Sequence, residues 1–161
     1  MQKDIIELAQ RLGQVLQAKN WLAATAESCT GGGVAYAITA ISGSSAWFDR
    51  SFVTYTNEAK QQMLGVAAST LETYGAVSEA VVREMTAGTL AHSQANIAVA
   101  ISGIAGPTGG SEEKPVGTVW IAWQTCEGEA RAERYLFSGD REQVRLQAIR
   151  EALSGLLSFS E

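Results

Sequence analysis

The chain has 161 residues, of which 46% are hydrophobic and 18% charged, so its composition suits one globular domain, which we expect to extend over residues 1–161. The net charge of -5 argues against nucleic acid as a partner, because non-specific binding to phosphates depends mainly on Lys and Arg. The sequence shows neither a signal peptide nor an apolar run that could cross a bilayer, which predicts a cytoplasmic protein without a membrane partner. Two cysteines and one histidine disfavour a metal site.

Apolar residues near the N-terminus recur at three- and four-residue spacing, which predicts an amphipathic helix over residues 4–18. A short apolar strand is predicted at residues 21–26. The glycine-rich turn of residues 27–33 then leads into a helix over residues 34–41. Polar residues of this turn therefore lie where a strand ends and the free N–H groups of a helix begin.

The middle of the chain is predicted to contain one strand and three helices. β-branched and aromatic residues favour a strand over residues 51–56, and Asn57 is a suitable cap for a helix that continues to about residue 64. A short helix is expected at residues 70–74. Ser78 can cap a longer helix that ends near residue 94.

The last part of the chain begins with a nearly continuous apolar run at residues 95–102, which is typical of a strand buried on both faces. A glycine-rich loop of residues 103–117 follows it. Residues 118–125 and 131–137 are predicted to form a hairpin, and Asp140 opens the final helix in a capping-box pattern. Helices that alternate with apolar strands, plus one hairpin, predict an α/β sandwich with a mixed sheet.

Ser28 lies at the end of the first predicted strand, so its hydroxyl would be close to the unpaired N–H groups of the next helix. Those donors could hold an oxyanion or a phosphate, although a serine in this place also serves as an ordinary helix cap. Cys29 is an alternative nucleophile, because a helix N-terminus favours the thiolate. Adjacent residues in a turn point in different directions, and the sequence leaves open which of the two faces a pocket.

A catalytic serine needs a base, and the single histidine, His92, lies inside a predicted helix. A lysine can replace it where the pKa is low enough for the neutral amine to be present. Lys60 is expected in the first turn of its helix, where the helix dipole disfavours a cation, and burial beside Phe52 and Tyr55 would lower its pKa further. An ordinary exposed lysine is the alternative interpretation.

The loop of residues 103–117 matches neither the P-loop nor the dinucleotide fingerprint, which disfavours a nucleotide triphosphatase. Its glycines would let backbone N–H groups approach an anion, and Thr108, Ser111 and Lys114 could add side-chain contacts. A long exposed connector would explain the same composition. Arg141, in the last helix, could reach a phosphate or lie in solvent.

Several separated motifs occur in the order seen in one known family. They are AESCTGG at residues 26–32, FVTYTNEAK at 52–60, GAVSE at 75–79, SGIAGP at 102–107 and KPVGTV at 114–119. Through these motifs the chain resembles the CinA C-terminal-domain family over nearly its whole length, and within that family it resembles the stand-alone amidases. The resemblance implies a three-layer α/β/α sandwich with a mixed, mostly parallel sheet.

The resemblance also implies hydrolysis of nicotinamide mononucleotide (NMN) to nicotinate mononucleotide and ammonia, in the recycling of pyridine nucleotides such as NAD, without a cofactor. Carried over by motif, Ser28 is the nucleophile, Lys60 its general base and Tyr55 an assisting hydroxyl. A homodimer is expected at this size. A non-catalytic nucleotide-binding or sensor module is the alternative function. The substrate-binding residues that the resemblance implies are Thr30, Gly31, Asn57, Gly103, Gly106, Thr108 and Arg141.

Overall fold

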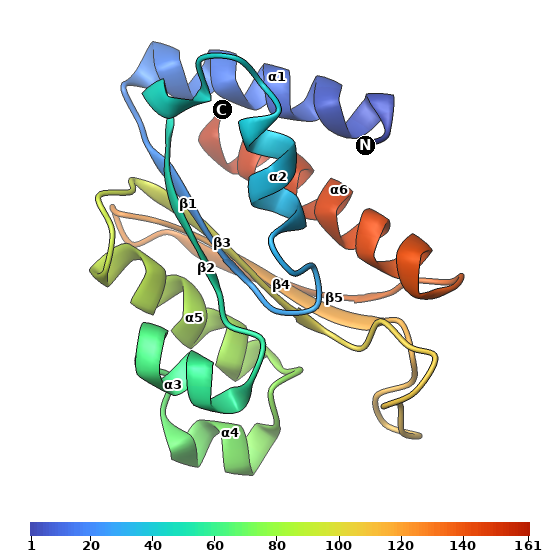
Figure 1. The fold of residues 1–161 in the computed structure, drawn as a ribbon. Coiled ribbons are helices and arrows are strands. Elements are labelled where there is room, and N and C mark those ends of the chain that lie inside the picture. The colour runs from blue at the N-terminus through green and yellow to red at the C-terminus, as the bar shows by residue number, and fades with distance from the viewer.

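The computed structural model describes residues 1–161, which fold around one five-stranded sheet (Figure 1). The strands are β1 (Ala23–Glu27), β2 (Phe48–Val53), β3 (Ile97–Gly103), β4 (Thr118–Thr125) and β5 (Ala130–Leu136). The helices are α1 (Lys3–Lys19), α2 (Gly33–Thr39), α3 (Asn57–Leu64), α4 (Ala68–Tyr74), α5 (Glu79–Ala91) and α6 (Arg141–Ser160), with a 3-10 turn at Ser44–Ala46. No helix combines the length and the apolarity needed to span a bilayer.

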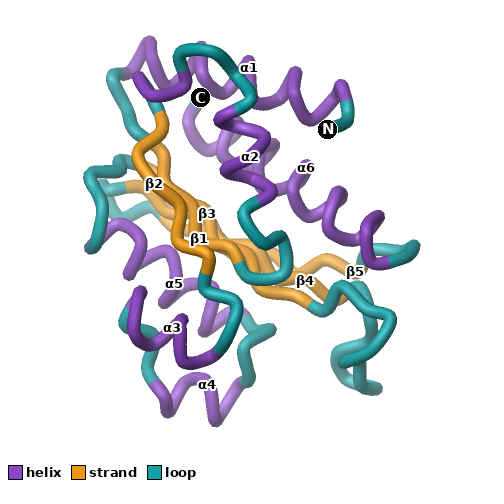
Figure 2. Tube along the Cα trace, in the orientation of Figure 1, coloured by secondary structure: helices purple, strands orange, loops and turns teal.

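The sheet lies between two layers of helices, with α1, α2 and α6 on one face and α3, α4 and α5 on the other (Figures 1 and 2). Its strand order is β2-β1-β3-β4-β5. β1 is parallel to both of its neighbours, whereas β4 is antiparallel to both of its own, so four of the five strands run in one direction. The predicted three-layer α/β/α sandwich with a mixed, mostly parallel sheet is therefore confirmed.

Two helix starts follow the predicted local signals. The hydroxyl of Ser78 accepts a hydrogen bond from the N–H of Val81 at 3.3 Å and so caps α5. Asp140 and Gln143 form both bonds of a capping box at the start of α6. These signals act within one turn of helix, which is why they can be found in the sequence alone.

Three boundaries in the middle of the chain differ from the prediction. β2 covers Phe48–Val53 instead of residues 51–56, because its parallel register pairs Phe48 with Ala23 and Val53 with Glu27 of β1. The predicted cap Asn57 is wrong, since Thr56 accepts a hydrogen bond from the N–H of Ala59 at 3.0 Å. α5 ends at Ala91, short of the predicted residue 94.

The hydrophobic core is divided by the sheet into two parts. Large side chains such as Ile101 and Ile121 pack against α1, α2 and α6, whereas the α5 face of the same strands carries a row of alanines in register, Ala26, Ala100 and Ala122. Alternation along each strand therefore assigns successive residues to opposite helical layers.

The chain leaves β1 toward β2 through α2 on one face, and reaches β3 through α3, α4 and α5 on the other face (Figure 1). The carboxyl end of β1 is thus the point where the connections diverge, and in open α/β sheets ligands bind outside the strands at such a point. Ser28 is the first residue after β1.

Candidate active site

The turn after β1 is held by the fully buried carboxylate of Glu27. One of its oxygens accepts hydrogen bonds from the hydroxyl of Thr30 at 2.7 Å and from the N–H of Val34 at 2.9 Å, and the other accepts from the N–H of Ala35 at 3.0 Å. Both oxygens are thereby tied to the start of α2. The carboxylate fixes the turn that presents Ser28, a role that our sequence analysis did not assign to Glu27.

α6 holds the same turn from the other side through Arg145. Its guanidinium donates hydrogen bonds to the carbonyls of Cys29 at 3.0 Å and Thr30 at 3.4 Å. The sequence carries no local signal for this contact, because Arg145 and Cys29 are separated by 116 positions. Ser28 is therefore presented by a turn that is anchored to both α2 and α6.

Lys60 is buried, with 1% of its surface exposed, and its Nζ atom lies 3.1 Å from Oγ of Ser28. The same nitrogen donates hydrogen bonds to the carbonyls of Thr54 at 2.9 Å and Tyr55 at 3.4 Å. Burial lowers the pKa of Lys60 from its ordinary value of 10.5, which favours the neutral amine. A neutral amine has two N–H donors, so with both given to the carbonyls its lone pair is left for the hydroxyl of Ser28.

Cys29 does not take the place of Ser28 next to Lys60. Its side chain packs in the core part that faces α6, and burial raises the pKa of the thiol to about 11. The thiol is therefore protonated at neutral pH and is a weak nucleophile. Of the two adjacent candidates, the structure brings Ser28 into hydrogen-bonding contact with Lys60.

A cavity of about 270 Å³ opens beside the Ser28–Lys60 pair. Residues from the turn after β1, the segment between β2 and α3, α3 itself, the segment between α4 and α5, the end of β3 with the loop after it, and the start of α6 line it. The predicted site residues among them are Ser28, Tyr55, Asn57, Lys60, Gly103 and Arg141.

Four predicted substrate-binding residues do not line this cavity. Thr30 is buried and donates its hydroxyl to Glu27, and Gly31 donates its N–H to the carbonyl of Ser28. Thr108 is exposed in the glycine-rich loop. The carbonyl of Gly106 accepts a hydrogen bond from Arg141 at 2.8 Å, so Gly106 contributes to the site through that arginine.

The hydroxyl of Tyr55 is bonded to Arg141, with 3.3 Å between the oxygen and Nη2, and it forms no hydrogen bond with Ser28 or Lys60. The backbone carbonyl of Tyr55 is the group that reaches the pair: it accepts a hydrogen bond from Lys60 and lies 3.5 Å from Oγ of Ser28. The side chain itself is 61% exposed. Tyr55 therefore contributes its main chain to the Ser28–Lys60 pair and its side chain to the rim of the cavity.

Ser102 also lines the cavity, although the sequence analysis did not select it as a site residue. Parallel pairing of Glu27 with Ile101 places Ser102 beside Ser28 at the carboxyl edge of the sheet. The available signal was the position of Ser102 at the end of an apolar strand that precedes a glycine-rich loop.

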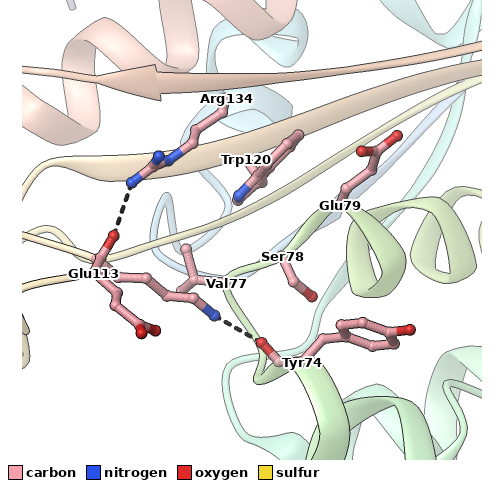
Figure 3. A pocket seen from close by; sticks show the side chains of 8 residues that line it. Tyr74, Val77, Ser78, Glu79, Glu113, Trp120 and Arg134 are labelled. Atoms are coloured by element: carbon pink, nitrogen blue, oxygen red, sulfur yellow. Dashed lines mark hydrogen bonds between the residues drawn. The ribbon is translucent and has the colours of Figure 1, made fainter.

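A second cavity, of about 310 Å³, adjoins the first and shares Val77 with it (Figure 3). Arg134 of β5 donates a hydrogen bond to the carbonyl of Glu113 at 3.0 Å, as Figure 3 shows. The Nζ atom of Lys114 donates to the carbonyl of Tyr74 at 2.7 Å. Both cations anchor the glycine-rich loop, so Lys114 binds the backbone at the end of α4 and lies outside the cavity that contains Ser28.

The residues that form the turn, the Ser28–Lys60 pair and the cavity come from motifs spread along most of the chain. One family model matches this whole stretch of the chain. It is the model described as CinA C-terminal domain, which matches residues 5–160. The chain belongs to this family. The resemblance inferred from the motifs is thereby confirmed.

Individual members of the CinA C-terminal domain family are similar to this chain over nearly its full length. Nicotinamide-nucleotide amidohydrolase PncC of Escherichia coli (strain K12) is 58% identical over 153 residues, which are 95% of this chain and 93% of that protein. PncC of Pseudomonas putida is 53% identical over 155 residues, 96% of each. The crystal structure of competence/damage inducible protein CihA from Agrobacterium tumefaciens gives a TM-score of 0.98 at 46% identity and covers 100% of this chain and 98% of that one.

Proposed function

We propose that this chain is an amidohydrolase that converts NMN to nicotinate mononucleotide and ammonia, with Ser28 as the nucleophile and Lys60 as its base. The observation that carries the proposal is the 3.1 Å contact between Lys60 Nζ and Ser28 Oγ, with the lysine buried and both residues lining one cavity. The similar PncC proteins are nicotinamide-nucleotide amidohydrolases, which supports the choice of substrate.

In the first step, neutral Lys60 takes the proton of Ser28 while Oγ attacks the carboxamide carbon. Negative charge develops on the amide oxygen, where backbone N–H groups around the cavity stabilise it. The C–N bond then breaks, and the ammonium group of Lys60 returns the proton to the departing nitrogen. The products of this step are ammonia and a nicotinoyl ester on Ser28.

In the second step, Lys60 is again neutral and takes a proton from a water molecule that attacks the ester carbon. The bond between that carbon and Ser28 Oγ breaks, and Oγ recovers its proton from Lys60. Nicotinate mononucleotide leaves, and the enzyme returns to its starting state. One lysine serves both steps because it is neutral at the start of each.

Substrate binding depends on the ribose and phosphate more than on the small amide, because remote contacts orient the reacting group. With Lys60 neutral, Arg141 is the one cation among the residues that line the cavity, and we assign the phosphate to it. Asn57 lines the same cavity and is assigned to the ribose. Free nicotinamide lacks both groups and is expected to be a poor substrate.

The proposal is tested by ammonia release from NMN by the purified protein, with Ser28→Ala and Lys60→Ala prepared in parallel. Turnover by the unmodified protein and its loss in both variants would support the serine–lysine mechanism. Binding of NMN without ammonia release would favour the non-catalytic nucleotide-binding module instead. An enzyme of pyridine-nucleotide recycling would act in the cytoplasm, and light scattering of the same preparation tests the expected homodimer.

A further inference from the structure

Among the buried residues that line the cavity with Ser28, two have a backbone N–H group without a hydrogen-bond partner in the protein, Cys29 and Ala105. Both residues line the cavity that contains Ser28 and Lys60, and they are only 6% and 4% exposed. A buried N–H group without a partner is uncommon, because desolvation of the group is then not offset by a bond. Each of the two groups is therefore free to donate to a ligand atom in the cavity.

The direction of each N–H group is set by the carbonyl of the same peptide unit. The carbonyl of Ser28 accepts from the N–H of Gly31 at 3.0 Å, and the carbonyl of Ile104 accepts from the N–H of Gly117 at 2.8 Å. In a trans peptide the C=O and N–H bonds point in opposite directions. Each N–H group therefore points away from the hydrogen bond that the carbonyl of its own peptide unit accepts.

The side chains of Cys29 and Ala105 pack in the core part that faces α6. Both residues also line the cavity, so their main chains are the parts expected to face it. One N–H group follows the nucleophile directly, and the other comes from the loop after the neighbouring strand β3. Serine hydrolases of an unrelated α/β fold bind their oxyanion with the same combination, the residue after the nucleophile and a second loop.

We propose that the backbone N–H groups of Cys29 and Ala105 form the oxyanion hole of the reaction. This inference rests on the proposed amidohydrolase function and assigns the donors that act in its transition state. Gly31 and Gly117 are positioning residues in this arrangement. Gly31 has a φ of +58° and Gly117 a φ of +97°, conformations that favour glycine. The turns that hold the carbonyls of Ser28 and Ile104 therefore need glycine at these two positions.

The direct test replaces one N–H group with an ester oxygen while the side chain stays the same. Lactic acid in place of Ala105 is compared with the unmodified protein, and lactic acid at position 29 is compared with Cys29→Ala. Each exchange is expected to lower kcat about 100-fold or more, with little change in KM for NMN. Lactic acid at position 67, whose N–H donates to Glu84 away from the cavity, is the control and should leave kcat unchanged.

A structural effect is separated from an oxyanion effect by two binding measurements. The aldehyde analogue of NMN adds to Ser28 and carries a tetrahedral oxyanion, so its affinity should fall in proportion to kcat/KM. The affinity for nicotinate mononucleotide, which carries no oxyanion on a tetrahedral carbon, should stay within about threefold. Equal losses of both affinities, or a kcat within about threefold of the amide parent, would overturn the assignment.

An independent measurement uses the unmodified protein and so does not depend on the folding of an ester variant. In ¹⁵N-resolved NMR spectra, the amide protons of Cys29 and Ala105 should move downfield when the aldehyde analogue binds, and much less with nicotinate mononucleotide. Unchanged resonances in the aldehyde complex would refute the inference. If the unmodified protein released no ammonia from NMN, the proposed function itself would fail, which is a different result.

Discussion

Lys60 and Ser28 are 32 positions apart in the chain, yet Nζ of one lies 3.1 Å from Oγ of the other. The contact exists because β1 and β2 are parallel neighbours, so that the residues following each strand meet at the same edge of the sheet. Ser28 comes directly after β1, and Lys60 lies in α3 after β2. The contact between the two residues therefore depends on the strand order as well as on the motifs that contain them.

The first prediction concerns the base. Lys60→Met is expected to lower kcat for NMN at least about 100-fold, because a positioned general base contributes about that much or more. Ser28→Ala should have an effect of similar size, and the double variant should be little worse than the single ones, since the two groups act as a unit. Lys3→Met, at a lysine side chain that is 92% exposed, is the matched control. Steady-state ammonia assays measure all four proteins, and additive losses in the double variant would contradict a shared step.

The second prediction is the pH dependence of turnover. The reaction needs neutral Lys60, and burial lowers the pKa of this lysine below 10.5, so activity should fall as pH decreases through the lowered pKa. The measurement is kcat/KM for NMN between about pH 5 and pH 10. The acid limb should be missing from any residual activity of Lys60→Met. If kcat/KM of this variant still decreased in the same way at low pH, the decrease would come from the titration of another group.

The third prediction links the same lysine to stability. Because the pKa of Lys60 is lower in the folded protein than its ordinary value of 10.5, the unfolded chain binds more protons between the two values, and stability rises with pH in that window. Lys60→Met removes this term. The variant should be more resistant to urea than the original protein below the folded pKa, and its advantage should shrink as pH approaches 10.5. A difference that stays constant from neutral to alkaline pH would be inconsistent with a lowered pKa of Lys60 in the folded protein.

The fourth prediction separates the two adjacent candidate nucleophiles. Burial raises the pKa of the Cys29 thiol to about 11, so iodoacetamide at neutral pH should modify exposed Cys126 first and leave turnover in place. Mass spectrometry of the treated enzyme identifies the modified cysteine. Cys29→Ala should cost far less activity than Ser28→Ala. Loss of activity in step with modification of Cys29 would point to the thiol instead.

The fifth prediction assigns the phosphate of the substrate. Arg141→Ala is expected to raise KM for NMN about tenfold to a hundredfold, because a hydrogen bond to a charged group contributes about 1.5–3 kcal/mol. Nicotinamide riboside lacks the phosphate, so its KM should change much less. Arg134→Ala, at an arginine of the second cavity, serves as the matched control. Equal effects of Arg141→Ala on both substrates would show that the arginine acts through Tyr55 and Gly106, which it also contacts.

Features that depend on neighbouring residues in the chain were predictable. The caps formed by Ser78 and Asp140 each involve residues within one helical turn, and the apolar run that became β3 needs no partner to be recognised. β2 was harder, because it is an edge strand that begins with Phe48, Asp49 and Arg50. An edge strand tolerates charged residues that a central strand excludes, so composition alone placed its start three residues too late.

The structure brings six of the predicted site residues to one cavity, but the sequence did not indicate which of their atoms face it. The motif around Tyr55 indicates that the residue belongs to the site, yet its carbonyl contacts Lys60 while its hydroxyl contacts Arg141. The choice between Ser28 and Cys29 depends on which layer of helices each one faces. The function of Glu27 depends on three donors that meet only in the folded turn. Some of these contacts are local in the chain and others are long-range, but all of them depend on the folded geometry of the turn and the layers, which composition and spacing do not encode.

Val77 is the single residue that lines both cavities, and it therefore acts as a partition between two compartments. The size of one aliphatic side chain then limits how far a bound amide can extend beyond the Ser28–Lys60 pair. Trp120 and Arg134 line the second compartment with Val77 (Figure 3), so a smaller residue at position 77 would open the first compartment toward them. Longer or bulkier amides would then have room, so the range of accepted substrates is adjustable at one position without altering the groups that perform the chemistry.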